Sequence, residues 1–133
     1  MFSDDELEMI NEAFANAYDE IDNSRILINA GKYKASIVHS YYSMFSAASA
    51  LLIAKNIQTK THEGLISEFG RLFVKNNLFN REIFKSFTRS RTSRKDANYD
   101  FSEVVTEEKA LNLINDAENF YTESPRVFSI LLE

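Results

Sequence analysis

The stretch YKASIVHSYYSMFSAASALLIAK, residues 33–55, decides the fold. If it is drawn as a helix, apolar side chains lie around most of the circumference, with Ile37 and Met44 on one side and Val38 on another. A helix that is apolar on nearly all sides is buried. Its middle, residues 43–50, carries mostly small side chains that would let a neighbouring backbone approach closely. We therefore predict a central helix surrounded by others.

The sequence on both sides of this stretch predicts further helices, because apolar side chains recur there every three or four positions. Ser3 and Glu6 are spaced as a capping box at the start of the first helix, and Gly31 can end that helix in the left-handed conformation. The later helices are predicted to begin after residues at which a helix can start: Thr61, Asn80 and Thr106.

Two segments toward the C-terminus are expected to interrupt this pattern. Residues 97–105 include aromatic residues that alternate with polar ones, and they predict a loop. Pro125 removes a helical hydrogen bond, so it should kink the last helix or begin a new short one. Whether the apolar tail Phe128–Leu132 completes the core of one chain or a dimer seam is left open.

Composition agrees with an all-helical chain. The 133 residues suit a single domain, 1–133, and include three Gly and one Pro, too few for the turns of a β-sandwich or for a glycine-rich phosphate loop. The absence of Cys excludes disulfides, thiolate zinc sites and a Cys nucleophile. We predict an all-α fold, an antiparallel up-and-down bundle of four to five helices.

The N-terminus gives no sign of a targeting signal, because Asp4, Asp5 and Glu6 are acidic where a signal peptide is basic. No uninterrupted apolar run approaches the roughly 18 residues of a membrane span. The expectation is a soluble cytoplasmic protein with no membrane partner.

Charge is distributed unevenly along the chain. Residues 1–24 carry 8 acidic and no basic side chains, residues 25–95 carry 13 basic and 3 acidic, and residues 96–133 carry 2 basic and 9 acidic. The three segment charges are therefore −8, +10 and −7, within a total of −5. The small total hides a strongly basic middle, so it does not argue against a nucleic-acid partner.

Four basic residues near the end of the fourth helix are the candidate phosphate or RNA ligands: Arg89, Arg91, Arg94 and Lys95. The planar guanidinium group matches phosphate oxygens with two parallel hydrogen bonds. The alternative interpretation is structural. In it, Arg91 and Arg94 pair with carboxylates of the acidic first and last helices, and the sequence leaves both interpretations open.

The chain has two histidines, and neither lies in a recognisable metal motif. His39, in the middle of the central helix, is expected to be partly buried and hydrogen-bonded. His62, at the start of the third helix, is expected to help the cap. We predict no metal site and no cofactor.

Several motifs, in order, resemble the HEPN-domain family (higher eukaryotes and prokaryotes nucleotide-binding). The likeness extends from about Glu12 to Tyr121, and the matching segments are residues 31–37, 40–45, 50–52, 60–65, 94–99, 105–108 and 116–120. It implies a small all-α domain that usually forms a homodimer. Many relatives are toxins or parts of defence systems, encoded beside a minimal nucleotidyltransferase that acts as the antitoxin.

The resemblance also implies a catalytic motif, from which this chain departs. Active relatives are metal-independent endoribonucleases with an Arg followed, after four to six residues, by a His. Here no His follows Arg94, and Tyr99 or Asn98 takes its place. Neither is a good base at neutral pH, and the loss of a general base typically lowers a rate about 10²–10⁴-fold.

Three functional hypotheses follow from the resemblance and the basic segment, and the third is a binder of nucleotides or nucleic acid without turnover. The first is a dimeric interaction module or toxin component that works with a nucleotidyltransferase and binds the phosphates of RNA or of a nucleotide. The second is an endoribonuclease with a degenerate motif, in which Arg94, Tyr99 and Asn98 are the candidate catalytic residues or a distant His fills the vacant role.

Overall fold

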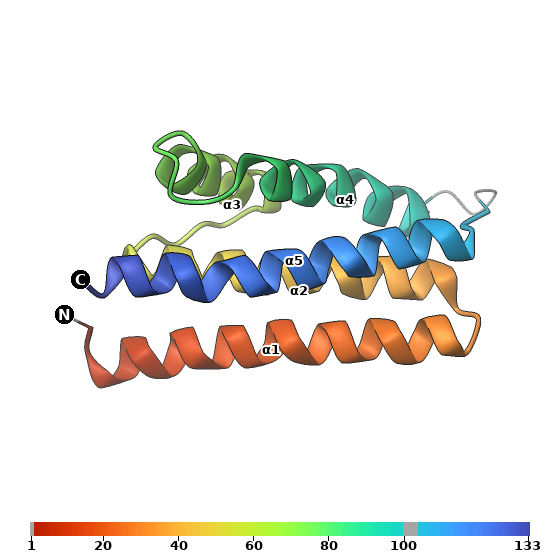
Figure 1. Ribbon diagram of the computed structural model, residues 1–133, viewed down its shortest axis with the longest axis horizontal. Coiled ribbons are helices and arrows are strands. Elements are labelled where there is room, and N and C mark those ends of the chain that lie inside the picture. Colours follow the sequence, from red (N-terminus) through yellow and green to blue (C-terminus); the bar gives the residue numbers. More distant parts are fainter. Residues whose placement is uncertain (1, 100–103) are drawn as a thin grey trace.

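The computed structural model describes residues 2–99 and 104–133, the side chains of residues 96–99 excepted. It contains five helices, which Figure 1 labels: α1 (Asp4–Asn29), α2 (Tyr33–Ala54), α3 (His62–Phe69), α4 (Arg81–Tyr99) and α5 (Glu107–Leu131). A short π-helical turn, Gly70–Val74, continues α3. Within the described part of the chain no residue lies in a β-strand.

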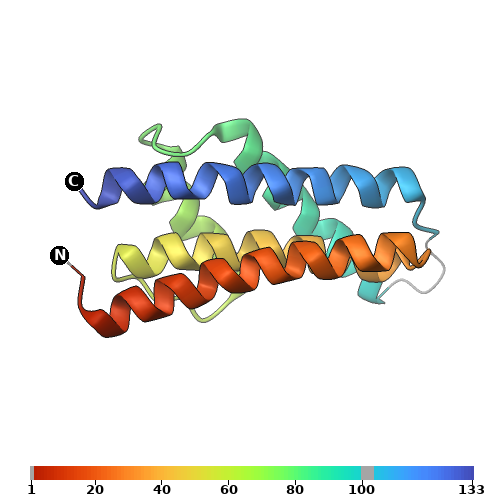
Figure 2. The same cartoon turned by 60° about the horizontal axis from the view of Figure 1, so that its bottom comes forward.

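The four long helices alternate in direction, and both chain ends lie at the same end of the bundle (Figure 1). Helix α2 packs against α1, α4 and α5, so it is the central helix that residues 33–55 predict. Helices α3 and α4 cover α2 on the side away from α1, and α4 runs obliquely across the bundle (Figure 2). The predicted all-α, up-and-down architecture is confirmed.

The core forms around α2. Its buried side chains include Tyr41, Met44 and Leu51, and they meet the aromatic rings of Phe69 and Phe87. Full burial of a large apolar side chain contributes about 1.5–3 kcal/mol relative to exposure. Because other helices surround α2, little of its surface faces water, and so it needs few charged side chains. By length and composition α2 could also cross a membrane, but 56% of its most apolar window is buried inside the bundle, as in the core helix of a globular domain.

Helix termini follow the sequence closely. Ser3 and Glu6 form both hydrogen bonds of the capping box. Gly31 has φ of +75° and ends α1 in a Schellman motif, in which the N–H of Lys32 donates to the carbonyl of Leu27 at 2.7 Å. The side chains of three further capping residues accept from backbone N–H groups, as their positions predict: Thr61, Asn80 and Thr106.

The small residues of α2 allow close contact with α1. The Ser43 hydroxyl donates to the carbonyl of Ala17 at 2.7 Å. The Ser24 hydroxyl lies 2.7 Å from the hydroxyls of both Ser36 and Ser40. All four serines are buried and each has a partner, so the interface carries polar groups without leaving them unpaired.

The loop prediction for residues 97–105 is wrong at its start, because α4 continues to Tyr99. No Gly or Pro occurs between Arg81 and Val105. Continuing the helix therefore satisfies backbone hydrogen bonds that a loop would leave to solvent, and no residue forces it to stop.

The alternative of a new short helix at Pro125 is also wrong. Helix α5 passes through Pro125 and ends at Leu131. The Ser124 hydroxyl donates to the carbonyl of Phe120 at 2.7 Å, one residue before the carbonyl that the proline leaves without its N–H donor. Packing of Val127, which is fully buried, holds the last turns in line with the rest of α5.

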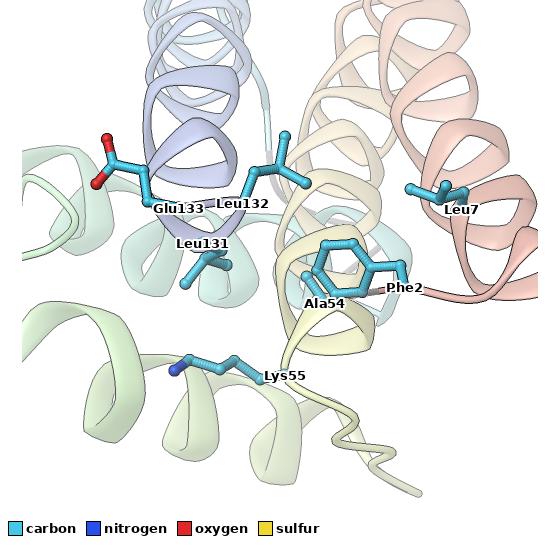
Figure 3. A pocket seen from close by; sticks show the side chains of 7 residues that line it. All are labelled: Phe2, Leu7, Ala54, Lys55, Leu131, Leu132 and Glu133. Atoms are coloured by element: carbon cyan, nitrogen blue, oxygen red, sulfur yellow. The ribbon is translucent and has the colours of Figure 1, made fainter.

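The apolar tail contributes to the core of the single chain. Phe128 stacks on Phe2 with ring centroids 5.9 Å apart, and Leu131 packs against the core cluster. Residues from both ends of the chain also line a half-open pocket of about 400 Å³ with mixed polar and apolar walls, to which Lys55 and Glu133 contribute (Figure 3). Leu132 remains 57% exposed at this end of the bundle.

Candidate functional site: a cationic and aromatic cluster between α2, α3 and α4

The candidate site begins with a hydrogen bond between two helices. The buried Tyr41 of α2 places its hydroxyl 2.6 Å from Nδ1 of His62, the first residue of α3. Their rings are nearly parallel, with an interplanar angle of 10° and centroids 5.7 Å apart. The Thr61 cap fixes the start of α3, so His62 is held against Tyr41 by both the cap and the ring contact.

Arg94 of α4 reaches the same tyrosine. Its Cζ lies 5.2 Å from the centroid of the Tyr41 ring and 5.9 Å from that of Tyr42. Such cation–π contacts contribute about 0.5–2 kcal/mol, the more so when they are shielded from water. The fold therefore brings Arg94 and His62 onto one tyrosine, although they are far apart in sequence.

Arg91 completes the cluster, one turn before Arg94 on the same face of α4. Its Nη2 donates to Oε1 of Glu63 at 3.1 Å, and the Glu63 side chain is 77% exposed. The Nε atoms of Arg91 and Arg94 are both buried, and neither has a hydrogen-bond partner in the described part of the chain. A buried donor without an acceptor costs about 1–3 kcal/mol, so these two N–H groups favour a ligand that brings oxygen atoms.

The two arginines and burial set the protonation of the cluster. Burial raises the pKa of Tyr41 to about 12, against the opposing effect of Arg94 and Arg91, so its hydroxyl stays protonated at neutral pH. Burial and then the positive charges of Arg94 and Arg91 lower the pKa of His62 below its usual 6.5. His62 is therefore neutral near pH 7 and can accept a proton.

A scan against protein-family models matches the HEPN domain over residues 10–127. This chain belongs to the HEPN domain family. Three similar proteins illustrate the relationship. A "Putative toxin" of Methanocaldococcus jannaschii is 32% identical over 113 residues, 85% of this chain and 84% of that protein. A second "Putative toxin" of the same archaeon is 30% identical over 121 residues, 91% and 80% of the two chains.

The third is a UPF0332 protein of Pyrococcus horikoshii, which is 39% identical over 77 residues. That match covers 58% of this chain and 54%, about half, of the length of the relative. The resemblance inferred from the motifs is confirmed, and with it the helical bundle that the HEPN family implies.

The structure places the predicted site residues of this HEPN domain in two groups. Arg91 and Arg94 come together beside His62, and the exposed Lys95 follows Arg91 by four residues, one helical turn. Arg89 lies elsewhere, close enough to Asp116 of α5 to oppose the rise in the pKa of that carboxyl that burial causes. The side chains of Asn98 and Tyr99 lie outside the described residues, and their catalytic role stays a prediction.

The alternative interpretation is that Arg91 and Arg94 pair with carboxylates of α1 or α5. The contacts in the cationic cluster differ from it. Arg91 pairs with Glu63 of α3, and Arg94 rests on tyrosine rings. An ion pair between outer helices does occur elsewhere, where Arg25 lies 3.6 Å from Glu118.

His39 has the structural role that its position predicts. It is partly buried, and its Nδ1 lies 2.9 Å from Oε2 of Glu20 on α1. His62 differs from the prediction, because it sits at the start of α3 but also contacts Tyr41. In the described ranges 2–95 and 104–133, no group of three or more carboxylate or imidazole side chains is arranged to hold a metal ion.

Sequence reasoning missed three members of the cluster: Tyr41, Tyr42 and Glu63. The two tyrosines belong to the family motif of the central helix, and the sequence predicts that they are apolar core residues. One sequence signal could have pointed to them, namely that three family motifs carry aromatic or charged residues. The tyrosines lie in the central-helix motif, His62 and Glu63 lie in the third-helix motif, and Arg94 begins the fourth-helix motif.

Proposed function

We propose that this HEPN domain is a toxin-like protein that binds the phosphates of RNA or of a nucleotide through Arg91 and Arg94. The observation that carries this proposal is the pair of buried Nε–H groups, on one helical face beside His62, that have no acceptor among the residues described by the structure. The names of two relatives, "Putative toxin", support the toxin-like role.

Phosphate suits this cluster for a chemical reason. The two Nε atoms are closed to solvent, so each arginine side chain would have to move before two phosphate oxygens could accept from its Nε–H and an Nη–H, the bidentate pair that arginine makes best. Neutral His62 can add a further donor or accept a proton from a protonated phosphate. The exposed Glu63 carboxylate holds Arg91 at 3.1 Å and would be displaced by the incoming anion.

The family assignment supports a proposal about the wider assembly. We propose that the domain works as a homodimer and that its partner is a minimal nucleotidyltransferase acting as the antitoxin. Lys95 and Arg89 extend the positive charge of α4 beyond the cluster, where they can attract a longer RNA by charge without a specific contact. The molecular mass by light scattering, together with co-purification with a nucleotidyltransferase encoded beside it, tests the assembly. A strict monomer that ignores such a neighbour would contradict it.

Phosphate binding is tested by calorimetry with ATP and with a short RNA, at low and at high salt. We expect binding that weakens steeply as salt rises and that Arg94→Ala lowers about tenfold or more. Arg71→Ala is the matched control, because Arg71 pairs with Glu68 on the exposed side of α3. Equal binding by the two variants, or no binding at low salt, overturns the proposal.

Endoribonuclease activity is a second candidate function, favoured by the position of His62 beside Arg94. In this reaction the 2′-oxygen of RNA attacks the phosphorus and the 5′-oxygen leaves, which gives a cyclic phosphate and a 5′-hydroxyl. His62 would take the proton of the 2′-hydroxyl while the arginines stabilise the phosphate charge, and water or the protonated His62 would supply the proton that the departing 5′-oxygen takes up. Tyr99 and Asn98 remain the alternative candidates for the proton transfer.

Labelled RNA incubated with a metal chelator distinguishes these cases. His62→Asn should abolish cleavage if His62 moves the proton, Tyr99→Phe should do so if Tyr99 does, and His39→Asn serves as the control. RNA that stays intact with the wild-type protein excludes the nuclease and leaves the phosphate-binding proposal in place.

A further inference from the structure

A groove lies near the cationic cluster. It is a groove of about 280 Å³ between α2 and the link 55–61, with Met9 of α1 at its edge. The groove floor is aliphatic, because Leu52 and Leu65 are buried there. The half-buried and exposed residues that form its walls and rim are Phe45, Ser49, Ile53, Ile57, Gln58 and Thr59.

The groove and the cationic cluster share a wall. The ring of Phe45 lines the groove and lies 4.5 Å, between centroids, from the ring of His62. The same ring lies 6.4 Å from Tyr42, which in turn carries the guanidinium of Arg94 at 5.9 Å. A ligand that holds a phosphate on Arg94 would therefore have to extend past Tyr42 and then Phe45 to enter the groove.

The chemistry of the groove fits a flat, partly polar group. Phe45 offers an aromatic surface for stacking, and Ile53 and Ile57 offer aliphatic contacts. The Ser49 hydroxyl donates to the carbonyl of Phe45 at 2.9 Å, which leaves its oxygen free to accept. Gln58, exposed at the rim, carries both an amide donor and an acceptor. A nucleobase has these same properties, with apolar faces and hydrogen-bonding edges.

We propose that this groove is the base subsite of the cluster, so that the ligand is a nucleotide unit with its phosphate on Arg91 and Arg94 and its base beside Phe45. The inference rests on the proposed function. The volume agrees with it, because 280 Å³ is just below the range of about 300–1,000 Å³ typical of pockets for drug-sized ligands, as suits one base.

Calorimetry with inorganic triphosphate, each of the four nucleoside triphosphates and a tetranucleotide RNA separates the two halves of the site. In the wild-type protein at least one nucleoside triphosphate should bind about tenfold or more tightly than triphosphate, since stacking of a base on an aromatic side chain is worth roughly 1–3 kcal/mol. The nucleoside triphosphates and the RNA distinguish a free nucleotide from a nucleotide within a strand.

Two substitutions test the groove. Ile53→Trp fills it and should lower the affinity for nucleoside triphosphates to that for triphosphate, with triphosphate binding unchanged. The control is Ile26→Trp, at a position of α1 that is 64% exposed. Gln58→Ala, at an exposed position that leaves the core intact, should reduce the differences among the four bases. Circular dichroism and the thermal midpoint confirm that each variant is folded.

The outcomes separate the two proposals. The base subsite is overturned if triphosphate binds as tightly as every nucleoside triphosphate, or if Ile53→Trp leaves nucleotide binding unchanged. Either result leaves the proposed phosphate site in place. No binding of any probe at low salt overturns the proposed function and the base subsite together.

Discussion

Buried polar groups lie on two sides of α2, and they differ in whether they have hydrogen-bond partners. On the face toward α1, Ser24, Ser36 and Ser40 are buried and joined by hydroxyl contacts of 2.7 Å. On the face toward α3 and α4, the buried Nε atoms of Arg91 and Arg94 have no acceptor in the described part of the chain. Paired groups stabilise the fold, whereas unpaired ones are costly and indicate a site that a ligand completes.

The largest expected effect follows from removing both arginines. In Arg91→Ala/Arg94→Ala the affinity for RNA and ATP should fall about 100-fold or more, since hydrogen bonds to charged groups are worth about 1.5–3 kcal/mol each. The free energy of unfolding should fall by no more than about 2 kcal/mol, because the cation–π contacts of Arg94 are lost while two Nε–H groups without an acceptor in the described part of the chain are removed. Calorimetry and urea unfolding measure the two quantities, and a large loss of stability with unchanged binding would assign the arginines to the fold.

Removal of one serine hydroxyl should have the opposite pattern. Ser24→Ala deprives the buried Ser40 hydroxyl of its contact, so the free energy of unfolding should fall by about 1–3 kcal/mol while RNA binding is unchanged. Ser129→Ala, at an exposed position of α5, is the control and should not lower stability. Urea unfolding with the slope compared between variants tests this, and equal stability of Ser24→Ala and wild type would contradict it.

The titration of His62 in the cationic cluster should make the free energy of unfolding depend on pH. Its folded-state pKa is lowered from 6.5, so the unfolded chain takes up this proton more readily, and the free energy of unfolding should fall as pH drops below about 6.5. His62→Asn should remove this dependence between pH 5 and 7, whereas His39→Asn should not. NMR titration should also show the His62 pKa rising when phosphate is added; a pKa above 6.5 without ligand would contradict the assignment.

The smallest expected effect concerns the carboxylate that competes with the ligand. Glu63→Gln removes the charge that holds Arg91, so RNA and ATP should bind about two- to fivefold more tightly, in keeping with the 0–1 kcal/mol of an exposed ion pair. Glu68→Gln, which breaks the neighbouring pair with Arg71, is the control. Weaker binding by Glu63→Gln would mean that Glu63 positions Arg91 rather than competing with the phosphate.

Much of the fold could be predicted from local patterns. The caps at Ser3, Thr61 and Thr106 and the end of α1 at Gly31 depend on residues within a few positions of each other, so the sequence contains them. The errors at residues 97–99 and at Pro125 have the opposite cause. There the backbone follows the continuity and packing of a whole helix, which a local signal such as alternation or one proline does not report.

The candidate site could be predicted only in part. The basic character of α4 and the choice of Arg91 and Arg94 came from the sequence, and the family resemblance focused attention on the missing His. The proximity of His62 could not be predicted, because Tyr41 and His62 lie 21 positions apart and belong to different helices. The position of Arg89 near Asp116 could not be predicted for the same reason, because it depends on how α4 and α5 pack together.

The sequence by itself determined an all-α HEPN domain with a buried central helix and a basic fourth helix, because periodicity, capping and segment charge are properties of neighbouring residues. Only the tertiary structure decided that Tyr41, His62 and Arg94 meet and that Phe45 lies between His62 and a groove. It also decided that two guanidinium Nε–H groups are buried with no acceptor within the described ranges. Those relations depend on how α3 and α4 cross α2, and that geometry is set by the packing of the whole core.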